Sequence, residues 1–448
     1  MSVRYLPLAP SEDRALLDTI GVERAEDLLV GIPEGLRIQS PLRLPAHASE
    51  MEVLRTMESL ASANRSFHSR FLGAGAYSHF VPAAVDHLSS RQEWFTSYTP
   101  YQPEISQGTL QAIFEYQTMI CELTGLEVTN ASMYDGATAA AEAALMGVRL
   151  TRKRGTILVS RGLHPHTLEV LCTLFTPREG LRLVEVGLKE GLTDLEDLKA
   201  KLDGEVACVL VGYPNFLGCV EDLRALAGPI HEAGALLVSV TQEALAFGWL
   251  EAPGRIGADL AAGEAMSFGN RTGFGGPFLG FLAAKDGAKR EMPGRLIGQT
   301  RDVDGRTGCV LTLASREQHI RRDKATSNIC SNQALVALRA NIFLQLAGPE
   351  GLRGLAEQNA AKAQYLRDKL LETKHFFPLW ETPFFNEFAL GCRGDVKALQ
   401  AACREAGILP GLDLEPYGWP GAMLWCATEL NTREDMDRLA QVLGAPPC

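Results

Sequence analysis

Residues 206–240, VACVLVGYPNFLGCVEDLRALAGPIHEAGALLVSV, begin and end with a short run of apolar residues. The runs at 206–211 and 235–240 are apolar at successive positions, which is typical of a strand buried on both faces of a parallel sheet. Three similar runs extend the pattern, at 156–160, 181–186 and 278–283. Helical patterns separate these runs, so the sequence predicts an α/β fold with a mostly parallel sheet flanked by helices.

The segment before this region has a different pattern. Ser11 is suited to be the N-cap of a short helix that Gly21 ends, and a further helix is predicted at 50–63. The first hundred residues therefore resemble a helical arm, and arms of this kind commonly embrace a partner subunit.

The segment after the α/β region is predicted to be mixed. A loop at 292–304 precedes a long helix at 328–371, which is expected to break near Gly348, and strands and helices then alternate. We therefore predict three parts: an N-terminal arm and interface segment at 1–107, a large α/β domain at 108–305, and a long helix with a small α+β domain at 306–448.

Composition excludes several classes of protein. The 448 residues are 46% hydrophobic and 22% charged, with a net charge of −11, which is typical of a globular protein and unsuited to binding a nucleic-acid backbone. Ten cysteines are scattered without CxxC spacing and predict reduced thiols. No leader and no apolar stretch of about 18 residues is recognisable, so a soluble cytoplasmic protein without membrane contact is predicted.

The segment 133–140, Met-Tyr-Asp-Gly-Ala-Thr-Ala-Ala, turns through glycine into an alanine-rich helix. A helix N-terminus with small side chains is suited to bind an anion. The candidate phosphate turn consists of Asp135, Gly136, Ala137 and Thr138. Asp135 would serve equally well as an N-cap, so the pattern leaves both interpretations open.

Two further segments are candidate sites. The turn at 271–277 is so rich in glycine that its backbone is expected to approach a ligand or a neighbouring chain closely, with Thr272, Gly275 and Gly276 as candidates. The loop at 98–108 combines two prolines with polar and aromatic side chains, a composition suited to a pocket or an interface. Its candidate residues are Tyr98, Tyr101, Gln102, Glu104 and Ser106.

Two histidines, His164 and His166, flank Pro165 at the start of a predicted helix. Residues two apart do not share a helix face, and neither cysteine nor a third histidine lies at metal-ligand spacing. We therefore predict a capping or stacking role for them and no metal site.

These motifs together resemble glycine decarboxylase, the P-protein of the glycine cleavage system, and in particular the first (alpha) subunit of its two-subunit bacterial form. The resemblance covers nearly the whole chain. Five stretches carry it: FLGAGAY at 71–77, TSYTPYQPEISQG at 96–108, ASMYDGATA at 131–139, GGP at 275–277 and RRDKATSNIC at 321–330.

The resemblance implies the pyridoxal-phosphate-dependent transferase fold of the aspartate aminotransferase type (fold type I), with a helical N-terminal arm and an α+β C-terminal domain. Enzymes of this fold bind pyridoxal phosphate through a lysine shortly before the glycine-rich turn. Here that place reads Ala-Met-Ser-Phe-Gly-Asn at 265–270, and no lysine lies between Lys201 and Lys285. Without an amine nucleophile the cofactor is not held covalently.

A second departure concerns the aspartate that such enzymes place beside the pyridine nitrogen. The corresponding positions at 240–243 are Val-Thr-Gln-Glu, so the phosphate turn is expected to belong to a vestigial cofactor pocket. Lys324 is an alternative amine, but it lies beside Arg321 and Arg322 and is better suited to an ion pair or a surface position.

The resemblance implies that this chain is the first subunit of glycine dehydrogenase (decarboxylating), with pyridoxal phosphate on the partner subunit. Its expected partners are that second subunit, in a heterodimer or heterotetramer, the lipoyl-bearing H-protein, and glycine. No catalytic residue is assigned to this chain itself; the candidate residues of the 98–108 loop and of the 271–277 turn are expected at the interface or at the partner's active site. Two alternatives stay open: a self-sufficient pyridoxal phosphate transferase or lyase of the same fold, and a purely structural or regulatory subunit.

Overall fold

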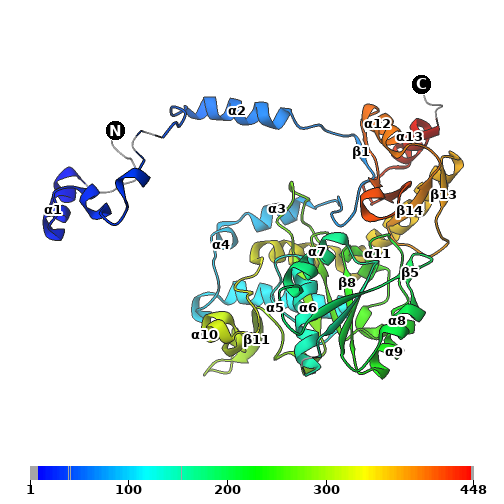
Figure 1. Ribbon diagram of the computed structural model, residues 1–448, viewed down its shortest axis with the longest axis horizontal. Helices are drawn as coiled ribbons and strands as arrows, with labels where there is room; N and C mark the ends of the chain where they lie inside the picture. The colour runs from blue at the N-terminus through cyan, green and yellow to red at the C-terminus, as the bar shows by residue number, and fades with distance from the viewer. Residues whose placement is uncertain (1–8, 39, 41, 153, 445–448) are drawn as a thin grey trace. The chain divides into compact units, whose positions relative to one another are not determined.

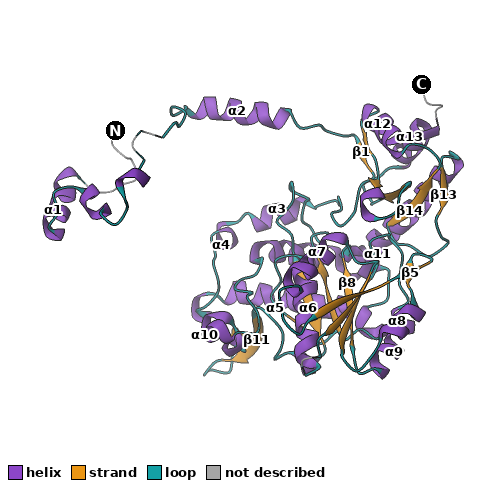
Figure 2. Ribbon diagram, viewed as in Figure 1, coloured by secondary structure: helices purple, strands orange, loops and turns teal. Residues whose placement is uncertain are grey.

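The computed structural model describes residues 9–38, 40, 42–152 and 154–444. The chain divides into two compact units, Met1–Arg65 and Ser66–Cys448. Figure 1 traces the chain through both units, and Figure 2 distinguishes their helices from their strands. The functional division at residues 107 and 305 stays a prediction.

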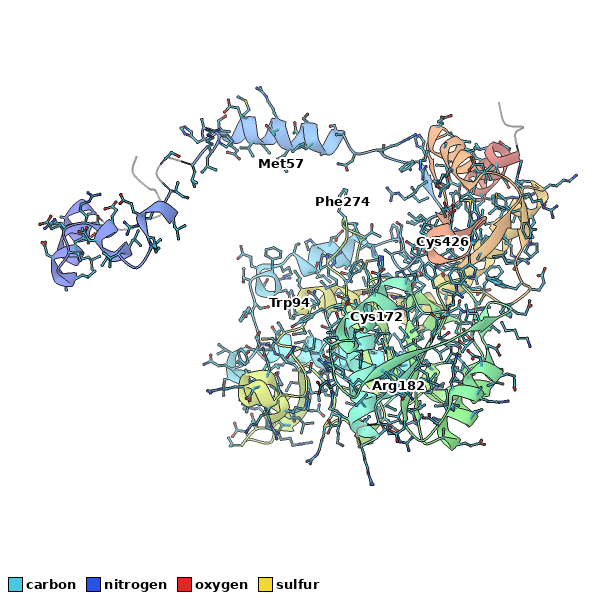
Figure 3. The ribbon with its side chains drawn as sticks, in the orientation of Figure 1. Met57, Trp94, Cys172, Arg182, Phe274 and Cys426 are labelled. Atoms are coloured by element: carbon cyan, nitrogen blue, oxygen red, sulfur yellow. The ribbon has the colours of Figure 1, made fainter. Side chains whose placement is uncertain are left out.

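The N-terminal unit consists of short helices. The prediction that Ser11 is an N-cap was wrong, because α1 begins at Pro10 and therefore contains Ser11. Its N-cap is Ala9, whose N–H donates to the Glu12 carboxylate at 2.8 Å. Gly21 does end this helix, at φ 83°. Figure 3 labels Met57 on α2, none of whose described residues is buried. The helices are α1 (Pro10–Ile20), η1 (Ala25–Leu29), η2 (Glu34–Leu36) and α2 (Glu50–Ser62).

A seven-stranded sheet forms the centre of the second unit, and its strand order is β2-β10-β9-β8-β7-β3-β4. The five strands from β9 to β4 in this order run parallel to one another, whereas β10 is antiparallel to both β9 and β2. The predicted α/β fold is confirmed, and four of the five predicted runs are strands of the parallel part. The strands are β2 (Val128–Thr129), β3 (Thr156–Ser160), β4 (Arg182–Val186), β7 (Val206–Gly212), β8 (Leu236–Thr241), β9 (Leu260–Glu264) and β10 (Gly280–Ala284).

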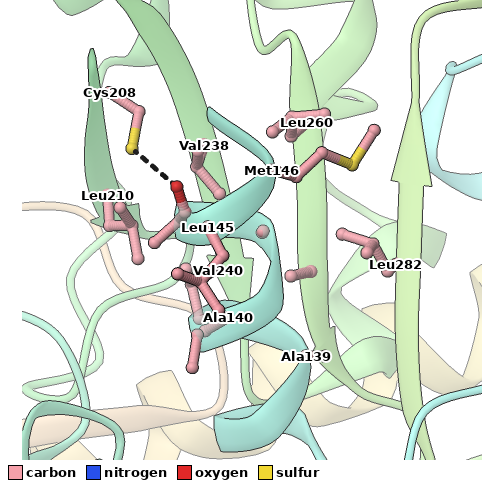
Figure 4. Close-up of a cluster of buried hydrophobic side chains, with 14 of the residues drawn as sticks. Ala139, Ala140, Leu145, Met146, Cys208, Leu210, Val238, Val240, Leu260 and Leu282 are labelled. Carbon is pink, nitrogen blue, oxygen red and sulfur yellow. Dashed lines mark hydrogen bonds between the residues drawn. The ribbon is translucent and has the colours of Figure 1, made fainter. Parts of the chain in front are cut away.

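Successive side chains of β3 enter different cores, because a strand points its side chains alternately to its two faces. Ile157 and Val159 of β3 pack with α6 and α7, whereas Leu158 packs with α8 and α9 on the other face. Figure 4 shows the α6 side of this core, where the Cys208 thiol donates to the Ala144 carbonyl oxygen at 3.8 Å. The helices on this part of the sheet are α6 (Gly136–Leu150), α7 (Pro165–Phe175), α8 (Leu195–Lys201) and α9 (Leu223–Glu232).

The prediction of a loop at 292–304 was wrong. This segment contains β11 (Leu296–Arg301), which pairs antiparallel with β12 (Thr307–Thr312). Only the first residues of β11 are buried, so its sequence lacks the alternation that indicates a strand. Ile297 packs against α5 (Gln107–Thr124), which ends at Gly125 with φ 67°.

The last part of the chain begins with α11 (Ala334–Glu372), in which Gly348 breaks the helical geometry with φ 61° and ψ −179°. The predicted break is therefore confirmed. A four-stranded sheet with the order β13-β14-β17-β16 follows. Its elements are β13 (Phe376–Pro378), β14 (Glu387–Cys392), α12 (Val396–Glu405), β16 (Leu412–Asp413), β17 (Ala422–Cys426) and α13 (Arg433–Gly444).

Two pairs of short strands lie outside the larger sheets. Strand β1 (Ser69–Arg70) pairs in parallel with β15 (Ile408–Leu409), and β5 (Leu188–Lys189) pairs with β6 (Leu192–Thr193). Within the described ranges, no helix has both the length and the apolar character needed to cross a bilayer. The short helices are α3 (Ala83–Ser89), α4 (Gln92–Phe95), η3 (Pro103–Ile105), η4 (Ala244–Gly248), η5 (Pro253–Ile256), η6 (Asp286–Ala288), η7 (Ala314–Arg316), α10 (Gln318–Arg321), η8 (Arg322–Lys324) and η9 (Glu415–Tyr417).

Candidate functional site

A cavity of about 390 Å³ lies where the carboxyl ends of β8 and β9 meet the N-terminus of α6. In open α/β sheets ligands bind at the carboxyl ends of the strands, because loops leave the strands there and the following helices begin there. The lining residues are Ala74, Gly75, Ala76, Asp135, Gly136, Ala137, His164, His166, Thr167, Val170, Gln242, Glu264 and Phe278. Three of the four residues of the predicted phosphate turn therefore line one cavity.

The phosphate turn forms the first turn of α6. Asp135 is the N-cap, because its carboxylate accepts the Thr138 N–H at 2.7 Å. The Gly136 N–H donates to Oε2 of Glu264 at 2.9 Å. A Cβ atom on residue 136 would lie 2.9 Å from the Glu264 backbone nitrogen, so glycine permits this close approach of helix and strand. Two of the amide groups that begin the helix are thus bonded to carboxylates of the chain itself.

Glu264, the last residue of β9, is 4% exposed. Besides the Gly136 N–H, its carboxylate accepts the N–H groups of Met266 at 3.1 Å and of Leu279 at 2.6 Å, both on Oε1. Burial raises the pKa of Glu264 to about 7. The three hydrogen bonds from backbone N–H groups act in the opposite direction, because they favour the ionised form. Glu264 was not predicted as a site residue, because the small side chains of β9 do not mark a strand in the sequence.

His164 forms another wall of the cavity and caps α7, as the sequence predicts. Its Nδ1 accepts the His166 N–H at 3.2 Å, and its Nε2 lies 2.9 Å from the Ala74 carbonyl oxygen. The first contact needs an unprotonated Nδ1 and the second a protonated Nε2, so the neutral ring satisfies both. Burial lowers the pKa of His164, which favours that neutral form.

The residues after β8 place a neutral side chain at the cavity. Gln242 lines it and donates from Nε2 to the Thr167 hydroxyl at 3.2 Å. Glu243 instead accepts the Leu245 N–H and contacts His79 Nε2, both at 2.9 Å. The only carboxyl groups at the cavity, among the described residues, are therefore those of Asp135 and Glu264.

The predicted loop at 98–108 lies beside a buried arginine. Arg295 donates from Nη2 to the Tyr101 hydroxyl at 3.2 Å, and its guanidinium lies 5.5 Å from the centre of the Tyr101 ring. Arg295 also donates from Nη1 to Ser331 Oγ and Asn332 Oδ1, each at 3.3 Å. The Ser331 N–H donates to the hydroxyl of Tyr134, the residue before the phosphate turn, at 3.3 Å. Arg295 and the 330–332 segment thus link Tyr101 to the start of α6.

The other candidate residues of this loop differ in exposure. Tyr98 is 84% exposed, Gln102 and Glu104 are exposed, and Ser106 is half-buried. Ser106 precedes α5 but makes no side-chain cap bond. This loop therefore presents polar and aromatic side chains outward.

The glycine-rich turn extends outward from the cavity wall. Thr272 accepts the N–H groups of Gly275 at 3.0 Å and of Gly276 at 3.3 Å through its carbonyl oxygen, and both glycines have positive φ angles. Phe274, labelled in Figure 3, lies at the tip of this turn and is 99% exposed, whereas Phe278 lines the cavity. No hydrogen bond between this turn and the 98–108 loop is present among the described residues.

The cavity does not fit covalently bound pyridoxal phosphate. Among the residues that the structure describes, no lysine lines it. Lys324 is exposed on η8 and is not part of the lining. Gln242, at the position where the family resemblance predicts a pyridinium partner, is neutral, and two carboxyl groups lie at the predicted phosphate turn. The residues of this cavity therefore support no catalytic step through a covalently bound cofactor.

The architecture nevertheless defines the class of protein by its fold, which is fold type I, the fold of many pyridoxal-phosphate-dependent enzymes. A sphingosine-1-phosphate lyase of Burkholderia pseudomallei has the same fold, with a TM-score of 0.65 and 16% identity over 92% of this chain and 94% of that one. A crystal structure of glycine decarboxylase (P-protein) of the glycine cleavage system, in inhibitor-bound form, is more similar. Its TM-score is 0.89, at 45% identity over 98% of this chain and 99% of that one.

The sequence comparisons identify the family. The family described as glycine cleavage system P-protein matches residues 3–443. Proteins described as probable glycine dehydrogenase (decarboxylating) subunit 1 are 48% identical in Desulforamulus reducens, over 99% of this chain and all of that protein, and 47% identical in Bacillus cereus, over 99% of both. The chain belongs to the glycine cleavage system P-protein family.

Proposed function

We propose that this chain is the first subunit of a two-subunit glycine dehydrogenase (decarboxylating). With a second subunit that holds pyridoxal phosphate, it decarboxylates glycine and passes the aminomethyl group to the lipoyl group of the H-protein. The cofactor supplies the electron sink for decarboxylation when it is bound to the second subunit. The relatives described as subunit 1 support this proposal. The observation that carries it is the cavity lining, which contains carboxyl groups and a neutral glutamine but, among the described residues, no lysine.

Exposed apolar side chains support a partner subunit. A soluble monomer rarely exposes apolar side chains in contiguous groups, because water disfavours them. In the N-terminal unit the exposed apolar residues include Leu16, Ile20, Met51, Val53, Leu54, Met57 and Leu60. In the second unit, exposed aromatic and aliphatic residues occur on or near both candidate segments, namely Phe95, Tyr98, Tyr101, Ile105 and Phe274. The candidate loop and turn are therefore suited to meet a partner.

The first test measures cofactor absorption and glycine–bicarbonate exchange for this chain alone, for the second subunit alone, and for their mixture. We expect this chain alone to show neither visible absorption from bound pyridoxal phosphate nor exchange, because its cavity offers no amine. The mixture should show both. A lone chain that is yellow, retains the cofactor after borohydride reduction and catalyses exchange would instead be a self-sufficient enzyme.

A second test asks whether this chain lends side chains to the partner's active site. The Tyr101→Phe variant keeps the ring beneath Arg295 but removes the hydroxyl that accepts from Nη2 at 3.2 Å. Hydrogen bonds to charged groups contribute about 1.5–3 kcal/mol, so misplacement of Arg295 should lower exchange by the assembled enzyme by roughly tenfold or more.

The matched control is Tyr365→Phe, which removes a hydroxyl that accepts from Arg433 Nε at 3.2 Å. Its ring likewise lies 5.6 Å from a guanidinium, but Tyr365 belongs to neither candidate segment. Assembly of both variants is followed by gel filtration with the second subunit. Unchanged turnover of an assembled Tyr101→Phe enzyme would favour the alternative of a purely structural subunit.

A further inference from the structure

The N-terminus of α6 has the properties of an anion site, and a carboxylate of the same chain already lies in it. Backbone N–H groups at a helix start carry partial positive charge and bind phosphate or carboxylate oxygens. Here Glu264 Oε2 lies 2.9 Å from the Gly136 nitrogen, and Glu264 Oε1 is held by the N–H groups of Met266 and Leu279. The carboxylate thus bridges the helix start, the end of β9 and the start of β10.

We infer that Glu264 acts as an internal substitute for a phosphate group, and that this side chain makes the cavity reject phosphorylated ligands such as pyridoxal phosphate. The inference deepens the proposed function and rests on it, because it gives the physical reason why the cofactor belongs to the other subunit. It concerns binding of the phosphate group and is separate from the absence of a lysine.

Space alone does not explain exclusion. The cavity measures about 390 Å³, and pockets that hold small molecules typically have roughly 300–1,000 Å³. A pyridine ring therefore has room between the N-terminus of α6 and His164. Two of the three N–H groups at the start of α6 are occupied by carboxylates, since the Gly136 N–H is bonded to Glu264 and the Thr138 N–H to Asp135. This leaves the Ala137 N–H as the remaining donor of the first turn for an anion in the cavity.

Charge strengthens this exclusion. A phosphate at the start of α6 would lie close to two carboxyl groups, and like charges at short range in a partly buried site repel strongly. Among the described lining residues no lysine or arginine is present to offset them. Removal of the Glu264 side chain therefore frees N–H donors, and above its pKa of about 7 it also removes one negative charge.

The test uses the full-length chain and two probes. Pyridoxamine 5′-phosphate is fluorescent and has no aldehyde to react with surface lysines, and inorganic phosphate tests the anion site alone. Binding is measured by fluorescence titration and by calorimetry for the wild type and for Glu264→Ala. The matched control is Glu221→Ala, which removes a carboxylate that is likewise 4% exposed and bonded to a backbone amide, at Thr193, but that does not line the cavity.

We expect Glu264→Ala to bind both probes roughly tenfold or more tightly than the wild type or Glu221→Ala, a change of at least about 1.4 kcal/mol. Pyridoxamine without the phosphate should gain no affinity. Equal affinities of the wild type and Glu264→Ala for both phosphates would overturn the inference. An equal gain for pyridoxamine would also overturn it, because the substitution would then only have enlarged the cavity.

The Glu264→Gln variant keeps the side-chain volume and guards against misfolding of the alanine variant. Its amide oxygen still accepts the Met266 and Leu279 N–H groups, whereas its NH₂ group faces the Gly136 N–H and accepts nothing. It should therefore show a smaller gain of the same kind. A wild-type chain that itself holds the cofactor would contradict the proposed function, whereas a folded Glu264 variant without gain contradicts only this inference.

Discussion

Replacement of His79 with leucine is expected to lower the free energy of unfolding by about 3–5 kcal/mol, because it leaves two buried carboxylates without their shared cation. The His79 side chain lies between Glu243 and Glu429, with Nε2 and Nδ1 each 2.9 Å from a carboxylate oxygen. Side-chain exposure of these three residues is 2%, 3% and 8%. Urea unfolding of the full chain, followed by circular dichroism, measures the loss.

The matched control for this substitution is His231→Leu. His231 also pairs with a carboxylate, Asp259 Oδ2 at 2.8 Å, but its side chain is 40% exposed and water screens the pair. We expect this variant to lose about 1 kcal/mol or less. Equal losses in both variants would show that the buried position of His79 has no special effect.

The pH dependence of the His79 effect follows from its pKa. Burial opposes the charge, but the carboxylates of Glu243 and Glu429 outweigh burial and raise the pKa of His79 from 6.5 to about 10. Because the folded pKa exceeds the unfolded one, this contribution is complete below pH 6.5 and is lost as the pH rises through 10. The difference between the wild type and His79→Leu should therefore shrink between pH 7 and pH 10. A constant difference across that range would contradict the charged state of His79.

The double variant Leu54→Asp/Met57→Asp is expected to weaken assembly with the second subunit on the order of 100-fold or more. Both residues belong to α2, and their spacing of three places them on one face of the helix together with Leu60. All three are more than half exposed in this chain, so burial against a partner would stabilise the complex. Gel filtration and exchange activity at fixed concentrations of the two subunits measure the effect.

The control for this prediction is Ser59→Asp, which lies on the opposite face of α2. It should leave assembly unchanged, since its side chain does not belong to the apolar stripe. Neither variant should lower the stability of the isolated chain, because no described residue of α2 is buried. Full assembly of the double variant at the lowest concentrations tested would refute a binding role for this helix.

The sequence predicted the parallel part of the sheet well because its strands are rich in Val, Leu and Ile, which mark buried strands. Strand β9 escaped prediction because it reads Leu-Ala-Ala-Gly-Glu, and its small residues allow α6 to pack closely, as the Gly136 contact shows. Glu264 was missed with it. A glutamate that directly follows a run of small apolar residues was the available signal.

The candidate loop was predictable from its composition and from the family resemblance, but its surroundings were not. Tyr101 contacts Arg295, which is 194 residues away in the sequence, and Arg295 contacts residues 36 and 37 positions farther on. No local pattern specifies such contacts, because they depend on how the β11–β12 hairpin folds back onto α5. The assignment of Tyr98, Gln102, Glu104 and Ser106 to an active site stays a prediction.

Residues 69–80 make hydrogen bonds to residues near the end of the chain, and these bonds can form only late in synthesis. His79 contacts Glu429, which is 350 residues later, and Tyr77 donates to Glu387 across 310 residues. At roughly 5–20 residues per second, a ribosome needs about 20–70 seconds to make the missing partner. Over that interval the nascent segment holds a histidine and a tyrosine whose native partners do not yet exist. The native contacts of residues 69–80 can therefore form only after the C-terminal strands and the residues that follow them have been made.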